Sequence, residues 1–191
     1  FMESFVYHSP TKVYFGKGMI NKLGKTAASL GSSALIVYGG GSIKRTVIYD
    51  AIVSQLDSAG IAHYDLSGVD PNPKISSVRE GVKLVKEYGI NIIIGVGGVS
   101  SLDCAKAVSG CAYLDCDAWE GVMDPSKVKK VVPFIAIPTL SATGSELDQI
   151  CVISNPDIPL KKPSHHGSGI HLFRKRLSDG LGHGRHILAY T

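Results

Sequence analysis

The residues from Asn91 to Ser109 constrain the fold of this chain more than any other stretch. Ile92–Val96 is an apolar run, typical of a strand that is buried on both faces of a parallel sheet. The run ends at Gly97-Gly98, where the backbone turns tightly without a Cβ in the way, and Ser100 is predicted to cap the helix that follows. A strand, a glycine turn and a helix N-terminus are the arrangement that holds a phosphate or pyrophosphate. The stretch therefore predicts a nucleotide or dinucleotide site.

Strands and helices alternate along the rest of the chain. Strands are predicted over 12–15, 34–38, 61–66, 131–137 and 150–154, and helices over 19–30, 47–59 and 75–88. This alternation predicts right-handed βαβ crossovers, and so an α/β fold with a doubly wound, mostly parallel, Rossmann-like sheet. Such sheets bind ligands at the carboxyl ends of their strands. Three glycine- or hydroxyl-rich loops, 39–42, 97–100 and 139–145, fall at those ends.

Composition narrows the class of protein. A hydrophobic content of 44% and a charged content of 19% fit a globular protein, and no apolar run approaches the length of a membrane span. Residues 1–16 lack the charged start and apolar middle of a signal peptide. The four cysteines show no C-x-x-C spacing, which argues against zinc and redox motifs. We therefore expect a cytoplasmic protein with reduced thiols and neither a membrane nor a nucleic acid as its partner.

The charge divides the chain into two unequal parts. Residues 1–160 contain 14 Lys and Arg against 15 Asp and Glu, a net charge of −1. Residues 161–191 contain 6 Lys and Arg against Asp179 alone, a net charge of +5, together with five of the seven histidines. We therefore predict a dinucleotide-binding domain over 1–162 and a basic, His-rich, divergent tail over 163–191. The tail's histidines could be metal ligands, but without a carboxylate partner or a periodic scaffold a frayed or loosely docked segment is the better prediction.

The loop at 39–42 bears on the choice of cofactor. A glycine-rich loop alone is equally typical of a plain turn. The first carboxylate after this loop is Asp50, whereas Lys44 and Arg45 are close by. A carboxylate here would accept hydrogen bonds from an adenosine ribose and repel a 2′-phosphate. Its absence beside two cations favours NADP(H) over NAD.

The loop at 97–100 and the helix after it leave alternatives open. Ser100 occupies the sixth position after Gly95, so the loop does not match G-x-G-x-x-G and would be a weak dinucleotide signal alone. Asp103 either stabilises the helix dipole from the first turn or accepts a hydrogen bond from the cofactor's ribose or carboxamide.

Five motifs occur in an order that resembles one known family. They are PTKVYFGKG at 10–18, YGGGSIK at 38–44, PNP at 71–73, GGVSSLD at 97–103 and TLSATGSE at 139–146. Together they resemble the iron-containing, or group III, alcohol dehydrogenases, most closely the butanol-dehydrogenase-like, NADPH-preferring branch. The resemblance runs from residue 5 to about 162, and Val99 departs from it where the family usually has a third glycine.

The resemblance implies a set of cofactor-binding residues. The adenosine ribose and its 2′-phosphate would be held by Gly39, Gly40, Gly41 and Ser42. The pyrophosphate would lie on Gly97, Gly98, Val99 and Ser100. The remaining cleft would be lined by Asn72, Asp103, Thr139, Leu140 and Thr143, with Lys161 near the nicotinamide ribose.

The family's helical domain, whose one Asp and three His bind the catalytic metal, has no counterpart in this sequence. The resemblance therefore implies a single domain without metal ligands, acting as an NADP(H)-dependent oxidoreductase that interconverts alcohols with aldehydes or ketones. The alternatives are a catalytically inactive NADP-binding remnant or interaction module, and metal-dependent catalysis by the tail.

Two further expectations follow from the same resemblance. Thr139, Lys161 or a tail histidine could donate the proton to a substrate carbonyl, and the sequence selects none of them. Loss of the helical domain would expose an apolar face near the cleft, which predicts a homo-oligomer.

Overall fold

The computed structural model describes residues 11–40, 42–142, 144–148, 150–158, 170–174 and 185–189. Its main sheet has six strands, and every neighbouring pair is parallel. Their spatial order is β1 (Lys12–Phe15), β8 (Arg185–Ala189), β5 (Phe134–Pro138), β4 (Ile92–Gly97), β2 (Ser33–Tyr38) and β3 (Ala62–Leu66). A separate antiparallel ribbon pairs β6 (Ile150–Ser154) with β7 (Ile170–Arg174).

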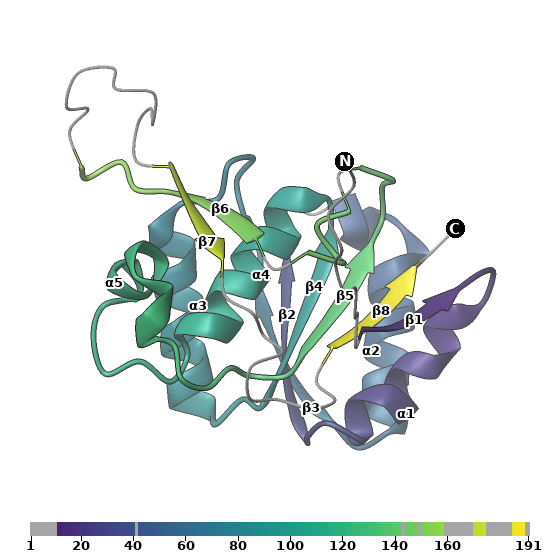
Figure 1. Ribbon diagram of the computed structural model, residues 1–191. Helices are drawn as coiled ribbons and strands as arrows, with labels where there is room; N and C mark the ends of the chain where they lie inside the picture. The colour runs from purple at the N-terminus through teal and green to yellow at the C-terminus, as the bar shows by residue number, and fades with distance from the viewer. Residues whose placement is uncertain are drawn as a thin grey trace, which may run out of the picture.

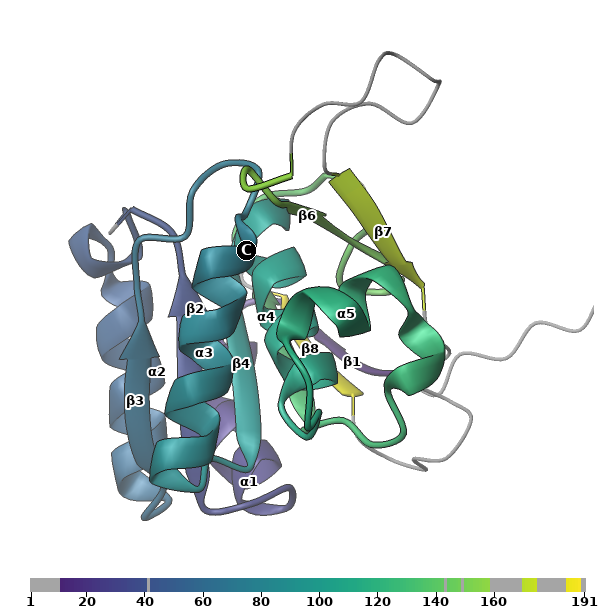
Figure 2. The ribbon, with the colours of Figure 1, turned by 90° about the vertical axis from the view of Figure 1, so that its left-hand side faces the viewer.

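Helices cover both faces of the main sheet, as Figure 1 shows. One face carries η1 (Met19–Lys22), α1 (Leu23–Ala28) and α2 (Val47–Ser58), which follows the short η2 (Ser42–Arg45). The other carries α3 (Ile75–Tyr88), α4 (Val99–Cys111), α5 (Ala118–Met123) and η3 (Pro125–Lys127). Figure 2 shows the β6–β7 ribbon beside α4 and α5. The predicted doubly wound, parallel α/β fold is confirmed.

The central strands are buried on both faces. On β2, Leu35 and Val37 belong to the core under α3 and α4, whereas Ile36 and Tyr38 belong to the core under α1 and α2. The alternation follows the two-residue period of a strand. Because both faces are covered, the strand sequence is continuously apolar, as the sequence analysis assumed.

Several element boundaries differ from the prediction: the helix predicted over 19–30 divides into η1 and α1, and several strand ends differ by one residue. Two further differences are larger or bear on the glycine turn. Helix α4 begins at Val99 with Gly98 as its N-cap, so Ser100 is not the cap, and no acid lies in the first turn. The φ of +125° at Gly97 completes the turn earlier than expected, which places Asp103 in the second turn. Strand β5 begins at Phe134 rather than Val131, and Pro133 directly before it has no N–H to donate to a neighbouring strand.

The segment after residue 162 contributes two strands. β8 lies between β1 and β5 in the main sheet, and β7 pairs with β6. Only the backbone of these two strands is described, including that of His171 and His186, whereas His165, His166 and His183 lie outside the described residues. The division of the chain at residue 162 stays a prediction. Within the described ranges, no helix is long and apolar enough to cross a membrane.

Candidate cofactor-binding site

The carboxyl ends of β2, β4 and β5 meet at the N-terminus of α4. The Thr139 amide donates to the Gly97 carbonyl at 3.1 Å, which fixes the loop after β5 to the glycine turn. A Cβ placed on Gly98 would lie 3.8 Å from the Leu140 side chain, and one on Gly39 would lie 3.6 Å from Ser101 Oγ. The structure therefore brings the loops that begin at Gly39, Gly97 and Thr139 together, as the sequence predicts.

The glycine turn presents backbone amides. The φ of Gly97 is +125°, a backbone conformation that residues with a side chain rarely adopt, so the turn requires glycine there. The Gly98 carbonyl accepts from the amides of Ser101 at 3.1 Å and Leu102 at 3.2 Å, which closes the first turn of α4. The first amides of a helix have no partner within the helix and carry its positive dipole end. Such a turn fits an anionic pyrophosphate.

The other predicted residues are more scattered. Gly40 is exposed, and a Cβ there would meet nothing within 4 Å. Asn72 is exposed, with a φ of 60°, in the loop after β3. That loop reaches the others through Val69, whose amide donates to the Tyr38 carbonyl at 3.2 Å. For Ser42 only the backbone is described, at the start of η2, and Gly41, Thr143 and Lys161 lie outside the described residues.

Asp103 lies inside the protein. The residue is 4% exposed, and both of its carboxylate oxygens accept protein hydrogen bonds. Oδ1 accepts from the Ser145 hydroxyl at 2.7 Å, and Oδ2 accepts from the Val152 amide at 3.0 Å. Asp103 thus joins α4 to the loop after β5 and to β6. Its predicted contact with the cofactor stays a prediction.

Lys106 is a buried cation that the sequence analysis missed. Its side chain is 4% exposed, and Nζ donates to the Ser145 hydroxyl at 2.7 Å and to its carbonyl at 2.9 Å. Nζ also lies 3.1 Å from Asp103 Oδ1 and 2.9 Å from Asp148 Oδ1, and it donates to the Ile150 carbonyl. We call these five residues the Lys106 cluster. It fastens the loop between β5 and β6 onto α4.

A second polar cluster joins residues on both sides of the 39–42 loop to strand β3. Asp65 Oδ2 accepts from the Tyr38 hydroxyl at 3.0 Å and from the Tyr49 hydroxyl at 2.7 Å. Lys44 Nζ lies 3.5 Å from the same oxygen, and 5.4 Å and 4.8 Å from the centroids of the Tyr38 and Tyr49 rings. Asp65 comes from β3, so the local sequence around 39–50 gave no sign of this carboxylate. We call these four residues the Asp65 cluster.

The Asp65 cluster perturbs the ionisation of its members. Burial, followed by the hydrogen bond to Asp65, raises the pKa of Tyr49 to about 12. Burial also raises the pKa of Tyr38, while a hydrogen bond with Tyr38 raises the pKa of Lys44. At neutral pH both phenols are therefore protonated donors and Lys44 is a cation.

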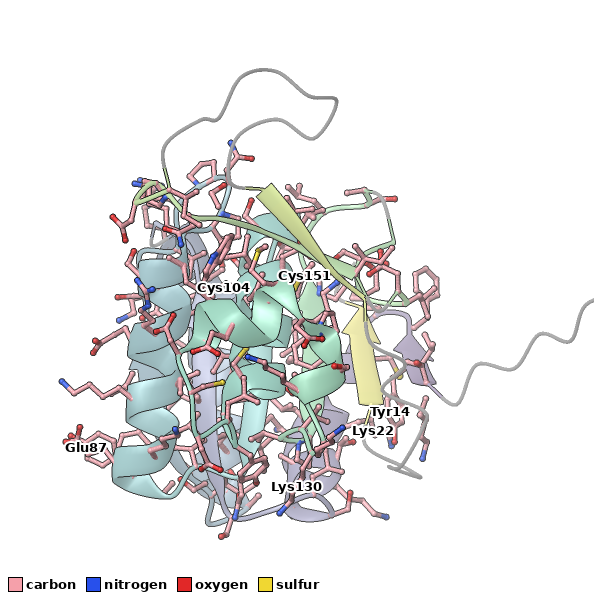
Figure 3. All side chains as sticks on the ribbon, turned by 60° about the vertical axis from the view of Figure 1, so that its left-hand side comes forward. Tyr14, Lys22, Glu87, Cys104, Lys130 and Cys151 are labelled. Atoms are coloured by element: carbon pink, nitrogen blue, oxygen red, sulfur yellow. The ribbon has the colours of Figure 1, made fainter. Side chains whose placement is uncertain are left out.

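The described residues do not fit a metal. Across the described ranges, no group of three or more His, Cys, Asp and Glu could hold an ion. Cys104 belongs to α4 and Cys151 to β6, and both are buried free cysteines, labelled in Figure 3. Burial raises the pKa of Cys104 to about 12 and that of Cys151 well above its usual value. These two thiols are therefore protonated, and thiolate is the form that binds metals.

Parallel strands, helices on both sheet faces and a glycine turn at the carboxyl edge define an α/β domain of the Rossmann-like class. Comparison with known proteins gives the family. A family model described as "Iron-containing alcohol dehydrogenase" matches residues 10–168, and the chain belongs to this family.

Several relatives agree with this assignment. The chain is 51% identical over 154 residues to NADH-dependent butanol dehydrogenase A of Clostridium acetobutylicum, covering 81% of this chain and 40% of the relative. It is 34% identical over 167 residues to the NADPH-dependent aldehyde reductase YqhD of Escherichia coli, covering 86% of this chain and 42% of the relative. The chain thus spans about 40% of the length of the curated relatives that it matches.

A solved structure matches the fold. NADH-dependent butanol dehydrogenase A of Thermotoga maritima superposes with a TM-score of 0.85 at 34% identity, covering 99% of this chain and 44% of the other. The predicted family and fold are both confirmed by these matches.

Proposed function

We propose that this chain binds NADP(H) and interconverts alcohols with aldehydes or ketones, with aldehyde reduction as the favoured direction. The observation that carries the proposal is the junction of Gly97, the N-terminus of α4 and Thr139 at the carboxyl edge of the sheet. Membership of the alcohol dehydrogenase family and the printed names of its relatives support the reaction class.

In this proposal the chain's own residues bind and orient the cofactor. The amides at Gly98, Val99 and Ser100 receive the pyrophosphate, because they stand at the positive end of α4. Gly39 and Gly40 leave room for the adenosine ribose, and Thr139 and Leu140 border the other side of the turn. The proposed set is completed by Gly41, Ser42, Asn72, Asp103, Thr143 and Lys161. When bound, the nicotinamide supplies the hydride, so the protein's task is positioning.

The preference for NADP(H) is the finer part of the proposal. Arg45 is exposed beside the 39–42 loop and can pair with a 2′-phosphate. Against this stand Asp65, which pairs with Lys44, and the name of the 51% identical relative, which is NADH-dependent. Calorimetric titration of the chain with NADP and NAD decides the matter. We expect the smaller dissociation constant for NADP, and tighter binding of NAD would reject the preference.

The catalytic part of the proposal concerns the 191 residues alone. The described residues offer no set of metal ligands, and we propose that the chain catalyses the reaction without a metal. A metal that polarises the carbonyl contributes several kcal/mol, so we expect turnover to be slow and poorly selective. The test is NADPH oxidation with a panel of aldehydes, before and after treatment with a chelator. Activity that survives the chelator supports the proposal, and activity lost with EDTA and restored by a divalent metal contradicts it.

The second candidate is a cofactor-binding protein without catalysis. It is favoured by one observation: Asp103, the first carboxylate after the glycine turn in the sequence, is buried, and both of its oxygens accept hydrogen bonds from within the protein. Cofactor binding without turnover at high protein concentration would establish this candidate and reject the first.

A further inference from the structure

The Asp65 cluster holds a cation close to the loop proposed to receive the adenosine ribose. Lys44 is the third residue of η2, which begins at Ser42 directly after the glycine loop. Its ammonium group is held by contacts within the Asp65 cluster. It lies on the rings of Tyr38 and Tyr49, with the Asp65 carboxylate 3.5 Å away.

The position of Asp65 is fixed by strand pairing and by two hydrogen bonds. It lies on β3 opposite Ile36 of β2, and two phenol donors orient its Oδ2. The Asp65 side chain is 29% exposed and that of Lys44 is 50% exposed, so water weakens their attraction without abolishing it. A carboxylate so placed disfavours binding of a 2′-phosphate because it neutralises and retains Lys44, the cation that would otherwise pair with that phosphate.

We propose that Asp65 is a specificity-determining residue for the cofactor, which disfavours a 2′-phosphorylated dinucleotide by retaining Lys44 against Tyr38 and Tyr49. This inference rests on the proposed function. It identifies a determinant on β3, outside the 39–42 loop that is proposed to contact the ribose. Removing the carboxylate releases Lys44 toward the loop and strengthens binding of NADP relative to NAD, whichever of the two the wild-type chain prefers.

The size of the effect follows from the contacts that are lost. A partly exposed ion pair and an exposed cation–π contact are each weak, so we expect the ratio of the NAD and NADP dissociation constants to change by about threefold to tenfold. NAD carries no 2′-phosphate, so its dissociation constant should change by less than about twofold, given the weak long-range effect of one surface charge.

The experiment measures the dissociation constants of NADP and NAD by calorimetry for wild type, Asp65→Asn and Asp65→Asn/Lys44→Met. Asparagine keeps an oxygen that can accept from the two phenols, so the variant retains its local hydrogen bonds. Asp65→Asn should bind NADP more tightly, and the added Lys44→Met should remove the gain. The matched control is Asp57→Asn. Asp57 is an exposed residue of α2 that pairs with His63, so this variant removes the same charge elsewhere and should leave the ratio unchanged.

The outcomes separate this inference from the proposed function. An unchanged ratio in Asp65→Asn, or a gain that persists without Lys44, would overturn the role of Asp65 and leave the proposed function intact. Failure of wild type to bind either dinucleotide at millimolar concentration would reject the proposed function and this inference with it.

Discussion

At the scale of single residues, Gly97 is the position where backbone geometry matters most for the proposed site. Its φ of +125° is open to glycine and costs other residues about 1–3 kcal/mol of strain. Gly97→Ala should therefore distort the turn, displace the amides at the start of α4 and weaken dinucleotide binding at least about tenfold, since 1.4 kcal/mol corresponds to tenfold. Calorimetry with NADPH and NADH measures the change.

Gly60 offers the control for this substitution. It also has a positive φ, of 68°, and a Cβ there meets nothing within 4 Å, but it lies in the turn between α2 and β3. Gly60→Ala should lower the free energy of unfolding without changing the dissociation constant. Equal weakening of binding by both variants would show that strain in general, rather than the turn at Gly97, is responsible.

Tyr49 makes stability depend on pH in the alkaline range. Its pKa is raised to about 12 in the folded chain, against an ordinary value of 10.0, so folded Tyr49 keeps a proton that the unfolded chain loses. The contribution of Tyr49 to the free energy of unfolding is fully present below pH 10 and falls as the pH rises toward 12. In urea unfolding between pH 9 and 11.5, wild type should lose stability more steeply than Tyr49→Phe. Equal slopes would contradict the role of Tyr49.

At the scale of elements, the Lys106 cluster fixes the loop between β5 and β6 to α4. Lys106→Met would leave the carboxylate of Asp103, whose side chain is 6% exposed, without its cation. Breaking a buried pair in this way costs about 3–5 kcal/mol, which urea unfolding measures. Hydrogen exchange should also quicken at the Thr139 amide, because its bond to Gly97 depends on the position of this loop.

The matched control for Lys106 is Lys127. Lys127 pairs with Glu120 at 2.6 Å, but both side chains are about half-exposed, at 43% and 50%. Lys127→Met should leave the free energy of unfolding nearly unchanged, because water already solvates both charges. A comparable loss of stability in the two variants would contradict a special role for the buried cation.

Elements formed by local pattern were predictable, and those formed by distant pairing were not. The bounds of β1 and α3 follow from alternation and helical spacing, and both elements appear as predicted. The position of β8 between β1 and β5 depends on pairing across more than 40 residues. The Lys106 and Asp65 clusters join residues up to 44 positions apart, so no local window could reveal either. The start of α4 differs from the prediction because it depends on the backbone conformation of one residue, Gly97.

At the scale of the whole molecule, exposed apolar side chains near the site bear on assembly. Leu140 is 70% exposed and Leu147 is 50% exposed, both in the loop between β5 and β6. We propose that this face mediates self-association, because water disfavours exposed apolar patches. Light scattering should give a dimer or larger mass for wild type and a smaller average mass for Leu147→Ser. Val47→Ser, which changes a 70% exposed side chain on α2, should leave the mass unchanged. A monomeric wild type would contradict the proposal.

The central claim is that a dinucleotide binds where β2, β4 and β5 end, against the N-terminus of α4. Hydrogen exchange read by mass spectrometry, with and without saturating NADPH or NADH, tests the location as well as the binding. The account predicts slower exchange in the peptides that contain Gly97–Ser101 and Thr139–Leu140, with little change in α5. Protection confined to other segments, or none at a concentration that saturates binding, would contradict it.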